Sequence, residues 1–356
     1  MNPTPPSCRL RGASALLAAT ALVATLAAAG EPARRMLVLT SSNDPAGNSV
    51  LVFALQDGAT PALPLVQSLP THGAGGASGN AGIVQFRDDA GAVANYGSNT
   101  VSRLVRSYDA IYLDGTIALA PGCLQPDSVA LAHDHLYVVG ANCAESHRWP
   151  QGALDAKAAL PDSSAGQIAA GRTWAAVTLK SGSVVQLPLT EGGTLSGTSA
   201  QIPLPADADN TPLGAAFWGD LLGFNPAHSA DSFALVDRDR EVFPVVGPTP
   251  PYPSNAPCWV AKGRGNIWYT GNSPGEAISI FFSDGAGGVF YKSLALPGVV
   301  TDLTVSADGR WLAAIYTADG AGFVAVFSID DYGDLTAVAT SAATGIAAYS
   351  GVAISQ

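Results

Sequence analysis

The feature that most constrains this chain is a short apolar segment that recurs every 39 to 49 residues. A repeat of this length is typical of a four-stranded sheet that cannot bury its own apolar face and must stack on its neighbours. The seven copies, AGIVQF, PDSVAL, AGQIAA, PLGAAF, PCWVAK, VTDLTV and YSGVAI, begin at Ala81, Pro126, Ala165, Pro212, Pro257, Val300 and Tyr349. They predict an all-β, seven-bladed β-propeller. A closed ring leaves few free sheet edges, so we expect a monomer.

The last copy lies too close to the end of the chain to supply a full blade. At the other end, MLVLTSS and SVLVFAL, between Met36 and Leu55, read as two strands with no inner strand before them. We expect Gly351–Ser355 to provide the inner strand of a blade that these N-terminal strands complete. Such pairing closes the ring across its seam.

Residues 1–30 have the pattern of a secretory signal. Arg9 and Arg11 precede an uncharged apolar run, Ala13–Ala29, whose last small residues suit signal peptidase. The run is short for a membrane span. We therefore expect residues 1–30 to be a signal peptide and residues 31–356 to form one propeller domain. The mature protein would be secreted or periplasmic and free of the membrane.

The charge of the mature chain limits its partners. Cleavage near Ala29 removes Arg9 and Arg11 and leaves 15 basic against 28 acidic residues. Nucleic acid and anionic membrane surfaces repel such a molecule. A small lactone, a carbohydrate or a protein remains as a partner.

Three cysteines remain after cleavage. Cys123 and Cys143 are equidistant from a turn at His133–Asp134, so in an antiparallel hairpin they face each other. We expect them to form a disulfide in an oxidising compartment. Cys258 lies on an inner strand, either as a buried small hydrophobe or as a thiol at the central channel, and is a candidate substrate-binding residue.

Several segments carry a family resemblance: THGAGGASGN from Thr71, NYGSNTVS from Asn95, APCWVA from Ala256, SADGRWLAAIY from Ser306 and NDPAGNSVLVFAL from Asn43. They resemble the secreted branch of the lactonase-family seven-bladed propellers, which includes 6-phosphogluconolactonase and 3-carboxymuconate-cyclizing enzymes. The resemblance extends over residues 36–356. It implies a water-accessible funnel through the ring and the opening or closing of a lactone, but no segment aligns with the His, Arg and Glu set of the muconate-cyclizing enzymes.

Strand alternation indicates where a site would lie. Loops that enter the inner strands and loops that follow the second strands open on one face, and we assign an irregular loop, Ala141–Trp149, to this face. A histidine there could accept a proton from water while arginine or asparagine stabilises an oxyanion. For cyclization, arginine would hold a substrate carboxylate. The candidate catalytic residues are His72, His147, Arg148 and His228, and the candidate substrate-binding residues are Asn80, Asn225, Asn255, Asn272 and Cys258.

Structural explanations of the same residues stay open. Asparagine recurs soon after strands because it tolerates positive φ and caps its own backbone. The His147–Arg148 pair could be solvated surface. A second hypothesis is therefore a noncatalytic binding or scaffold propeller that recognises a carbohydrate, peptide or protein. If the protein is an enzyme, export favours an extracellular sugar lactone or an aromatic-derived lactone over the cytoplasmic phosphogluconate metabolite.

Carboxyl groups near the channel raise the question of a metal. A different group of propeller lactonases holds calcium in the channel with Asp, Asn and Glu oxygens, and Asp127 and Asp302 lie near the starts of inner strands in this chain. No spacing singles out such a cage. We expect no metal and no other cofactor.

Overall fold

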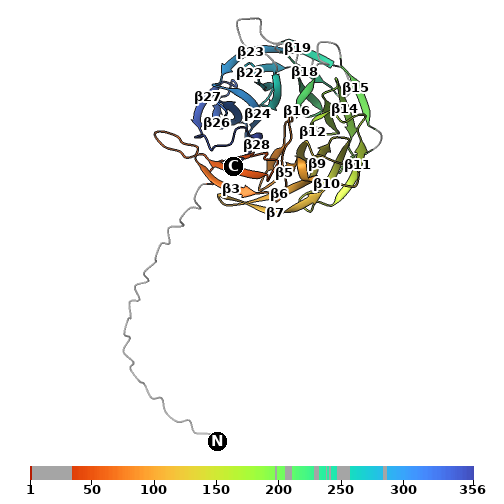
Figure 1. Ribbon diagram of the computed structural model, residues 1–356, viewed down its shortest axis with the longest axis horizontal. Helices are drawn as coiled ribbons and strands as arrows, with labels where there is room; N and C mark the ends of the chain where they lie inside the picture. Colours follow the sequence, from red (N-terminus) through yellow and green to blue (C-terminus); the bar gives the residue numbers. More distant parts are fainter. Residues whose placement is uncertain are drawn as a thin grey trace. The chain divides into compact units, whose positions relative to one another are not determined.

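The computed structural model describes residues 1, 34–196, 199–204, 211–227, 232–237, 239, 242–246, 257–283 and 287–356. Within these residues the chain forms seven four-stranded antiparallel sheets, arranged as a ring of blades around a central axis (Figure 1). The one helical element that the described residues contain is a 3₁₀ turn, η1 (Tyr96–Ser98). The prediction of an all-β, seven-bladed propeller is confirmed.

Each blade runs from an inner strand near the axis to an outer strand at the rim. In that order, the strands of blades 1 to 3 are β28 (Ser350–Ser355), β1 (Leu37–Ser41), β2 (Ser49–Ala54) and β3 (Leu65–Pro70); β4 (Val84–Arg87), β5 (Ala90–Asn95), β6 (Thr100–Ser107) and β7 (Ala110–Ala118); and β8 (Ser128–Ala132), β9 (His135–Gly140), β10 (Cys143–Arg148) and β11 (Leu154–Ala159).

Blades 4 to 7 follow the same order. Their strands are β12 (Ala165–Ala170), β13 (Trp174–Leu179), β14 (Ser183–Pro188) and β15 (Ala200–Pro203); β16 (Pro212–Trp218), β17 (Leu221–Pro226), β18 (Ser232–Val236) and β19 (Val242–Val246); β20 (Pro257–Lys262), β21 (Ile267–Asn272), β22 (Ala277–Ser283) and β23 (Gly288–Ala295); and β24 (Val299–Val305), β25 (Trp311–Ala318), β26 (Ala321–Ile329) and β27 (Leu335–Thr340).

The seven repeated segments coincide with the seven inner strands, and the apolar faces of the blades pack on one another. At one such contact, Val38 and Phe53 of blade 1 and Ile315 of blade 7 belong to a single buried cluster. Full burial of an aliphatic or phenyl side chain stabilises a fold by about 1.5–3 kcal/mol. Stacking therefore supplies the core that no blade has alone.

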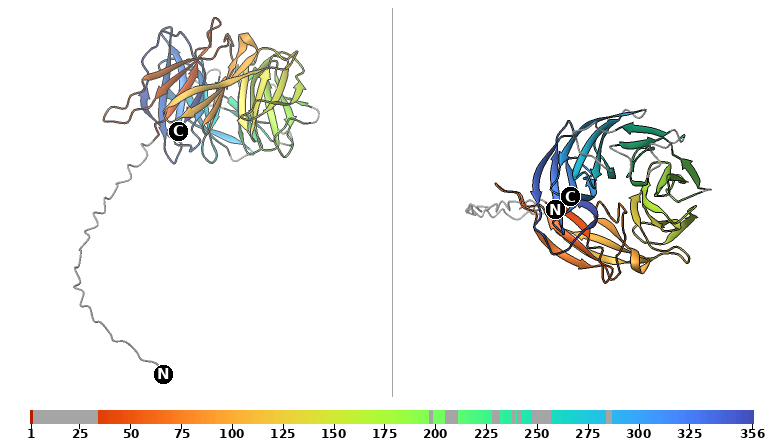
Figure 2. Two further views of the ribbon diagram at one scale, coloured as in Figure 1. Left: turned by 90° about the horizontal axis from the view of Figure 1, so that it is seen from below. Right: turned by 45° about the horizontal axis from the view of Figure 1, so that its top comes forward.

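The ring closes at the seam that the sequence predicts. β28 pairs antiparallel with β1, placing Leu37 opposite Ser355 and Leu39 opposite Ala353. The hydroxyl of Thr40 also donates a hydrogen bond of 2.6 Å to the carbonyl of Gly351. The C-terminus thus lies beside the N-terminal strands (Figures 1 and 2).

One local prediction is wrong. The turn after β9 contains only Ala141 and Asn142, and residues up to Arg148 form strand β10 rather than an irregular loop. Since β10 runs back across the blade, Arg148 pairs with His135 at the turn on the opposite face. The segment reads as a loop because its polar side chains, from Glu145 to His147, are buried in the strand.

Some predictions concern residues outside the described ones. His228 and Asn255 are among these, as is nearly all of the predicted signal peptide, so the division into residues 1–30 and 31–356 stays a prediction. The described residues contain no helix that is long and apolar enough to cross a membrane.

Candidate functional site

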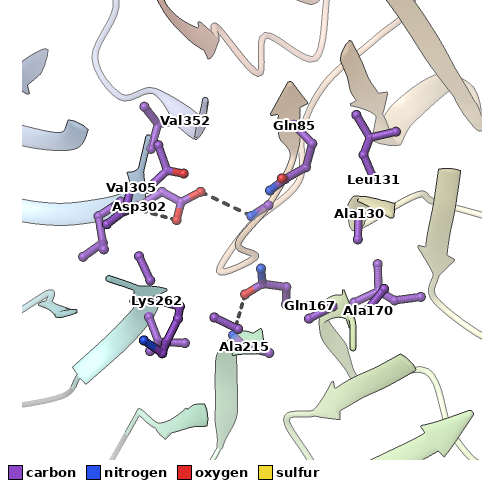
Figure 3. A pocket seen from close by; sticks show the side chains of 18 residues that line it. Gln85, Ala130, Leu131, Gln167, Ala170, Ala215, Lys262, Asp302, Val305 and Val352 are labelled. Atoms are coloured by element: carbon purple, nitrogen blue, oxygen red, sulfur yellow. Dashed lines mark hydrogen bonds between the residues drawn. The ribbon is translucent and has the colours of Figure 1, made fainter. Parts of the chain in front are cut away.

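A chamber of about 220 Å³ lies among the inner strands (Figure 3). Its walls are mostly small or aliphatic side chains such as Ala130, Ala215 and Val352. The polar side chains that line it are Gln85, Gln167, Lys262, Asp302 and Thr304. Drug-sized pockets measure about 300–1,000 Å³, so this chamber suits a single small ring.

Among the described residues, Asp302 is the one carboxyl group that lines the chamber. β24 has an irregular register between Val300 and Asp302, and a bulge of this kind re-aims a side chain. One carboxyl oxygen accepts the N–H of Gly82 at 3.2 Å, and the other accepts the N–H of Leu303 at 2.8 Å. The backbone of Val352 also hydrogen-bonds to the group. Asp302 therefore joins blade 7 to blades 1 and 2.

Burial decides the ionisation of this carboxyl group. Asp302 is 5% exposed, and removal from water raises its pKa to about 7, although three backbone N–H groups act in the opposite direction. The effect of burial on the pKa outweighs that of the hydrogen bonds, because burial penalises the charged form and no cation of the described residues is paired with the carboxylate. A group with this pKa can exchange a proton near neutral pH.

Gln167 supplies a hydrogen-bond donor to the same chamber. It lies in a second inner-strand bulge, between Ala165 and Ile168 of β12, and is 8% exposed. Its Oε1 accepts the N–H of Ala215 at 2.6 Å. No described residue accepts a hydrogen bond from Nε2, which lies 3.0 Å from where a Cβ on Gly82 would be. The amide thus has one end fixed and one end available.

Besides Thr304, two further polar side chains, Gln85 and Lys262, line the chamber. Gln85 projects into the chamber from β4 (Figure 3). Lys262, at the end of β20, donates to the carbonyls of Gly263, Gly265 and Ile267 and lies 5.1 Å from the ring centres of two tryptophans. Burial lowers its pKa to about 8. The three carbonyls hold the Lys262 ammonium in place.

A second polar network lies where the chain enters blades 2 and 3. Lys180 donates to Asn80 Oδ1 at 2.6 Å, and Asn80 Nδ2 donates to Asp127 at 2.6 Å. Burial raises the pKa of Asp127 to about 6, while Lys180 and Asn80 act to lower it. Burial also lowers the pKa of Lys180. Asn80, a candidate substrate-binding residue, is thus fully engaged between two charged side chains.

The described candidate catalytic residues do not meet at one point. His72 is exposed in the loop before β4. His147 is 1% exposed inside blade 3, and Arg148 pairs with Asp155 at 2.9 Å on the opposite face of the ring. None of these three lines the chamber.

The remaining described candidates lie within blades. Asn272 donates to Ser279 and accepts from Thr270, as a strand-end residue with a structural role would. Asn225 is fully buried, and neither amide atom has a hydrogen-bond partner among the described residues. Cys258 is buried on β20, and burial raises the pKa of its thiol despite hydrogen bonds with Ser273.

Cys123 and Cys143 form a disulfide with a Cα–Cα distance of 5.6 Å. It joins the loop before β8 to the start of β10.

Asp302 and Gln167 were missed as site residues because chain position alone does not distinguish them. Both occupy the third position of the repeated segment, where the other copies have Ile83, Ser128, Gly214, Trp259 and Gly351. A polar residue at that position of an inner strand is the available signal. That it faces the chamber depends on bulges, which the pattern of residue types does not reveal.

No protein-family model and no curated protein matches the sequence. Solved structures match it in fold. A protein from Lactobacillus plantarum is 12% identical, with a TM-score of 0.67 over 91% of this chain and 100% of its own. A candidate 6-phosphogluconolactonase from Bacteroides fragilis is 11% identical, with a TM-score of 0.65 over 91% and 99%. The periplasmic gluconolactonase of Pseudomonas aeruginosa is 12% identical, with a TM-score of 0.62 over 91% and 99%. The chain therefore has the seven-bladed fold found in lactonase-like propellers.

Proposed function

We propose that this protein hydrolyses a small lactone in the central chamber. The observation that carries the proposal is that Asp302, with a pKa of about 7, and the available Nε2 of Gln167 line the same small cavity. A base and an oxyanion donor in one cavity are what ester hydrolysis requires. The names of the structural neighbours from B. fragilis and P. aeruginosa support the same reaction class.

In the proposed reaction, ionised Asp302 takes a proton from water as the water oxygen bonds to the lactone carbonyl carbon. Gln167 Nε2 donates to the oxyanion that forms. Collapse of this intermediate breaks the ring C–O bond, and protonated Asp302 returns its proton to the leaving alkoxide. The product is a hydroxy acid, which ionises in solution. The charge of Asp302 is therefore needed at the first step.

The test measures acid release from a panel of five- and six-membered sugar lactones. Asp302→Asn should lower kcat by about 10²- to 10⁴-fold, and Gln167→Leu by about 10²-fold. Asp319→Asn is the matched control, because it makes the same change in blade 7 at an exposed turn whose φ of 49° asparagine accepts. Wild-type kcat should rise with pH through about 7.

A His72→Ala variant distinguishes catalysis in the chamber from catalysis at the loop that carries His72. If His72→Ala abolishes turnover and Asp302→Asn does not, the reaction occurs at the loops instead. If neither the wild type nor any variant turns over a lactone, the binding or scaffold hypothesis replaces the enzymatic one.

We also infer export, from the signal-like residues 1–30; an N-terminus near residue 30 on the mature protein would support it, and an intact leader would contradict it.

A further inference from the structure

A second cluster of reactive side chains lies inside blade 3, outside the chamber. Cys143, Glu145 and His147 alternate along β10, so they share one face of the strand. The Sγ atoms of Cys123 and Cys143 and a carboxyl oxygen of Glu145 all lie within 4.8 Å of one another. His147 Nε2 is 3.0 Å from Glu145 Oε2. The Glu145 carboxyl group thus lies within 4.8 Å of two sulfurs and 3.0 Å from a histidine nitrogen, in a space closed to solvent.

The outer hydrogen bonds of this cluster match those of a metal centre. His147 Nδ1 is 3.2 Å from the carbonyl of Gly152, which fixes the proton on Nδ1 when Nε2 binds a metal. Glu145 Oε1 accepts the N–H of Ala120 at 3.0 Å. Ligating histidines and carboxylates in proteins are usually oriented in this way by a second layer of partners. In blade 3 those partners are already in place.

The spacing also suits a tetrahedral ion. Tetrahedral zinc with bonds of about 2.0–2.3 Å places its ligand atoms roughly 3.3–3.8 Å apart. The 3.0 Å contact between Glu145 and His147 and the sulfur–oxygen separations of up to 4.8 Å lie near these values. For all four atoms to surround one ion, the two sulfurs would separate on reduction and the His147 ring would turn toward them. Burial of all four residues, each at most 2% exposed, would leave no open coordination position for water.

We propose that reduction of the disulfide converts this cluster into a closed zinc site with Cys123, Cys143, Glu145 and His147 as ligands. A dithiol reductant would transfer two electrons and two protons to the S–S bond and become a disulfide itself. Zn²⁺ would then displace both thiol protons and the proton between Nε2 and Glu145. This site departs from the sequence-based expectation of no metal, and it does not depend on the proposed lactone hydrolysis.

The test uses Co²⁺ as a spectroscopic probe of the full-length mature protein, reduced and freed of reductant under argon. One Co²⁺ per chain should bind with thiolate-to-cobalt charge-transfer absorption and tetrahedral ligand-field bands, and Zn²⁺ should displace it. The oxidised protein should show neither signal. Glu145→Gln and His147→Gln should each weaken binding at least about tenfold, whereas Glu191→Gln, at an exposed turn, should not.

A Cys123→Ser, Cys143→Ser double variant provides the control for folding without the disulfide, measured by circular dichroism. It keeps Glu145 and His147 but should give no charge-transfer band. The proposal is overturned if reduction unfolds the wild type, if the folded reduced protein takes up no Co²⁺, or if Glu145→Gln binds Co²⁺ as tightly as the wild type.

Discussion

Two buried carboxyl groups, Asp302 and Glu145, are accommodated in the fold by different partners. Glu145 is 0% exposed, accepts the N–H of Ala120 and is paired with His147. Asp302 is 5% exposed, accepts only backbone N–H groups and lines a cavity. One group is matched by an ionisable partner, and the other has none among the described residues.

This difference in partners distinguishes a catalytic role for Asp302 from a structural role for Glu145. A buried carboxylate without a cation destabilises the fold when it ionises, because desolvation outweighs its hydrogen bonds. If residue 302 served only to join blade 7 to blades 1 and 2, a neutral residue could take its place. Groups that lower stability while lining a cavity are typical of active sites, where activity and stability trade off. Glu145, in contrast, is fully partnered, as expected for a structural role in the oxidised protein.

The largest expected effect is on the pH dependence of stability. The pKa of Asp302 is about 7 in the folded protein, against an ordinary value of 3.8 for an aspartate side chain in water. The folded state therefore holds a proton that the unfolded state releases, so the contribution of Asp302 to stability is greatest below pH 4 and is lost as pH rises through about 7. The predicted loss between pH 4 and pH 8 is on the order of 4 kcal/mol.

Urea unfolding of the wild type and Asp302→Asn across this range tests the prediction. The Asn variant cannot ionise, so its free energy of unfolding should gain on that of the wild type as pH rises. A smaller fall should persist in the variant because the pKa of Asp127 is also raised, to about 6. If the free energies of unfolding of the two proteins change in parallel with pH, ionisation of Asp302 does not destabilise the fold.

The next effect concerns the partnered carboxyl group. Glu145→Ala removes the acceptor of the Ala120 N–H and the partner of His147, leaving both polar groups buried. We expect the free energy of unfolding to fall by about 3 kcal/mol at pH 7. Urea unfolding measures it, with Glu191→Ala at an exposed turn as control. A loss no greater than that of the control would mean that the pair contributes nothing.

How far the sequence predicts this molecule follows from what each feature depends on. The inner strands and the seam between Gly351–Ser355 and the N-terminus were predicted because both depend on a repeated apolar pattern. The strand character of Cys143–Arg148 was missed, since the buried residues from Glu145 to His147 in that strand are polar.

The chamber was harder to predict. Asp302 was noted only as a residue near the start of an inner strand, because its environment depends on Gly82 and Val352, which belong to other blades. Lys180 carried no local signal, and Gln167 carried only its polarity at an inner-strand position, because the partner of each lies in a different blade or loop. Spacing along the chain identifies blades, whereas the site depends on contacts among them.

The smallest expected effect on stability is that of Glu145→Gln, which tests whether hydrogen bonds or charge accommodate the buried Glu145. In Glu145→Gln, the amide oxygen can still accept the Ala120 N–H, and the amide NH₂ can donate to Nε2 of a neutral His147 whose Nδ1 donates to Gly152. All groups keep partners, so the free energy of unfolding should change by less than about 1 kcal/mol in the oxidised protein. If urea unfolding instead shows a loss as large as that of Glu145→Ala, the charge of Glu145 rather than its hydrogen bonds stabilises blade 3, and the two carboxyl groups would differ in the counter-charge they meet rather than in their partners.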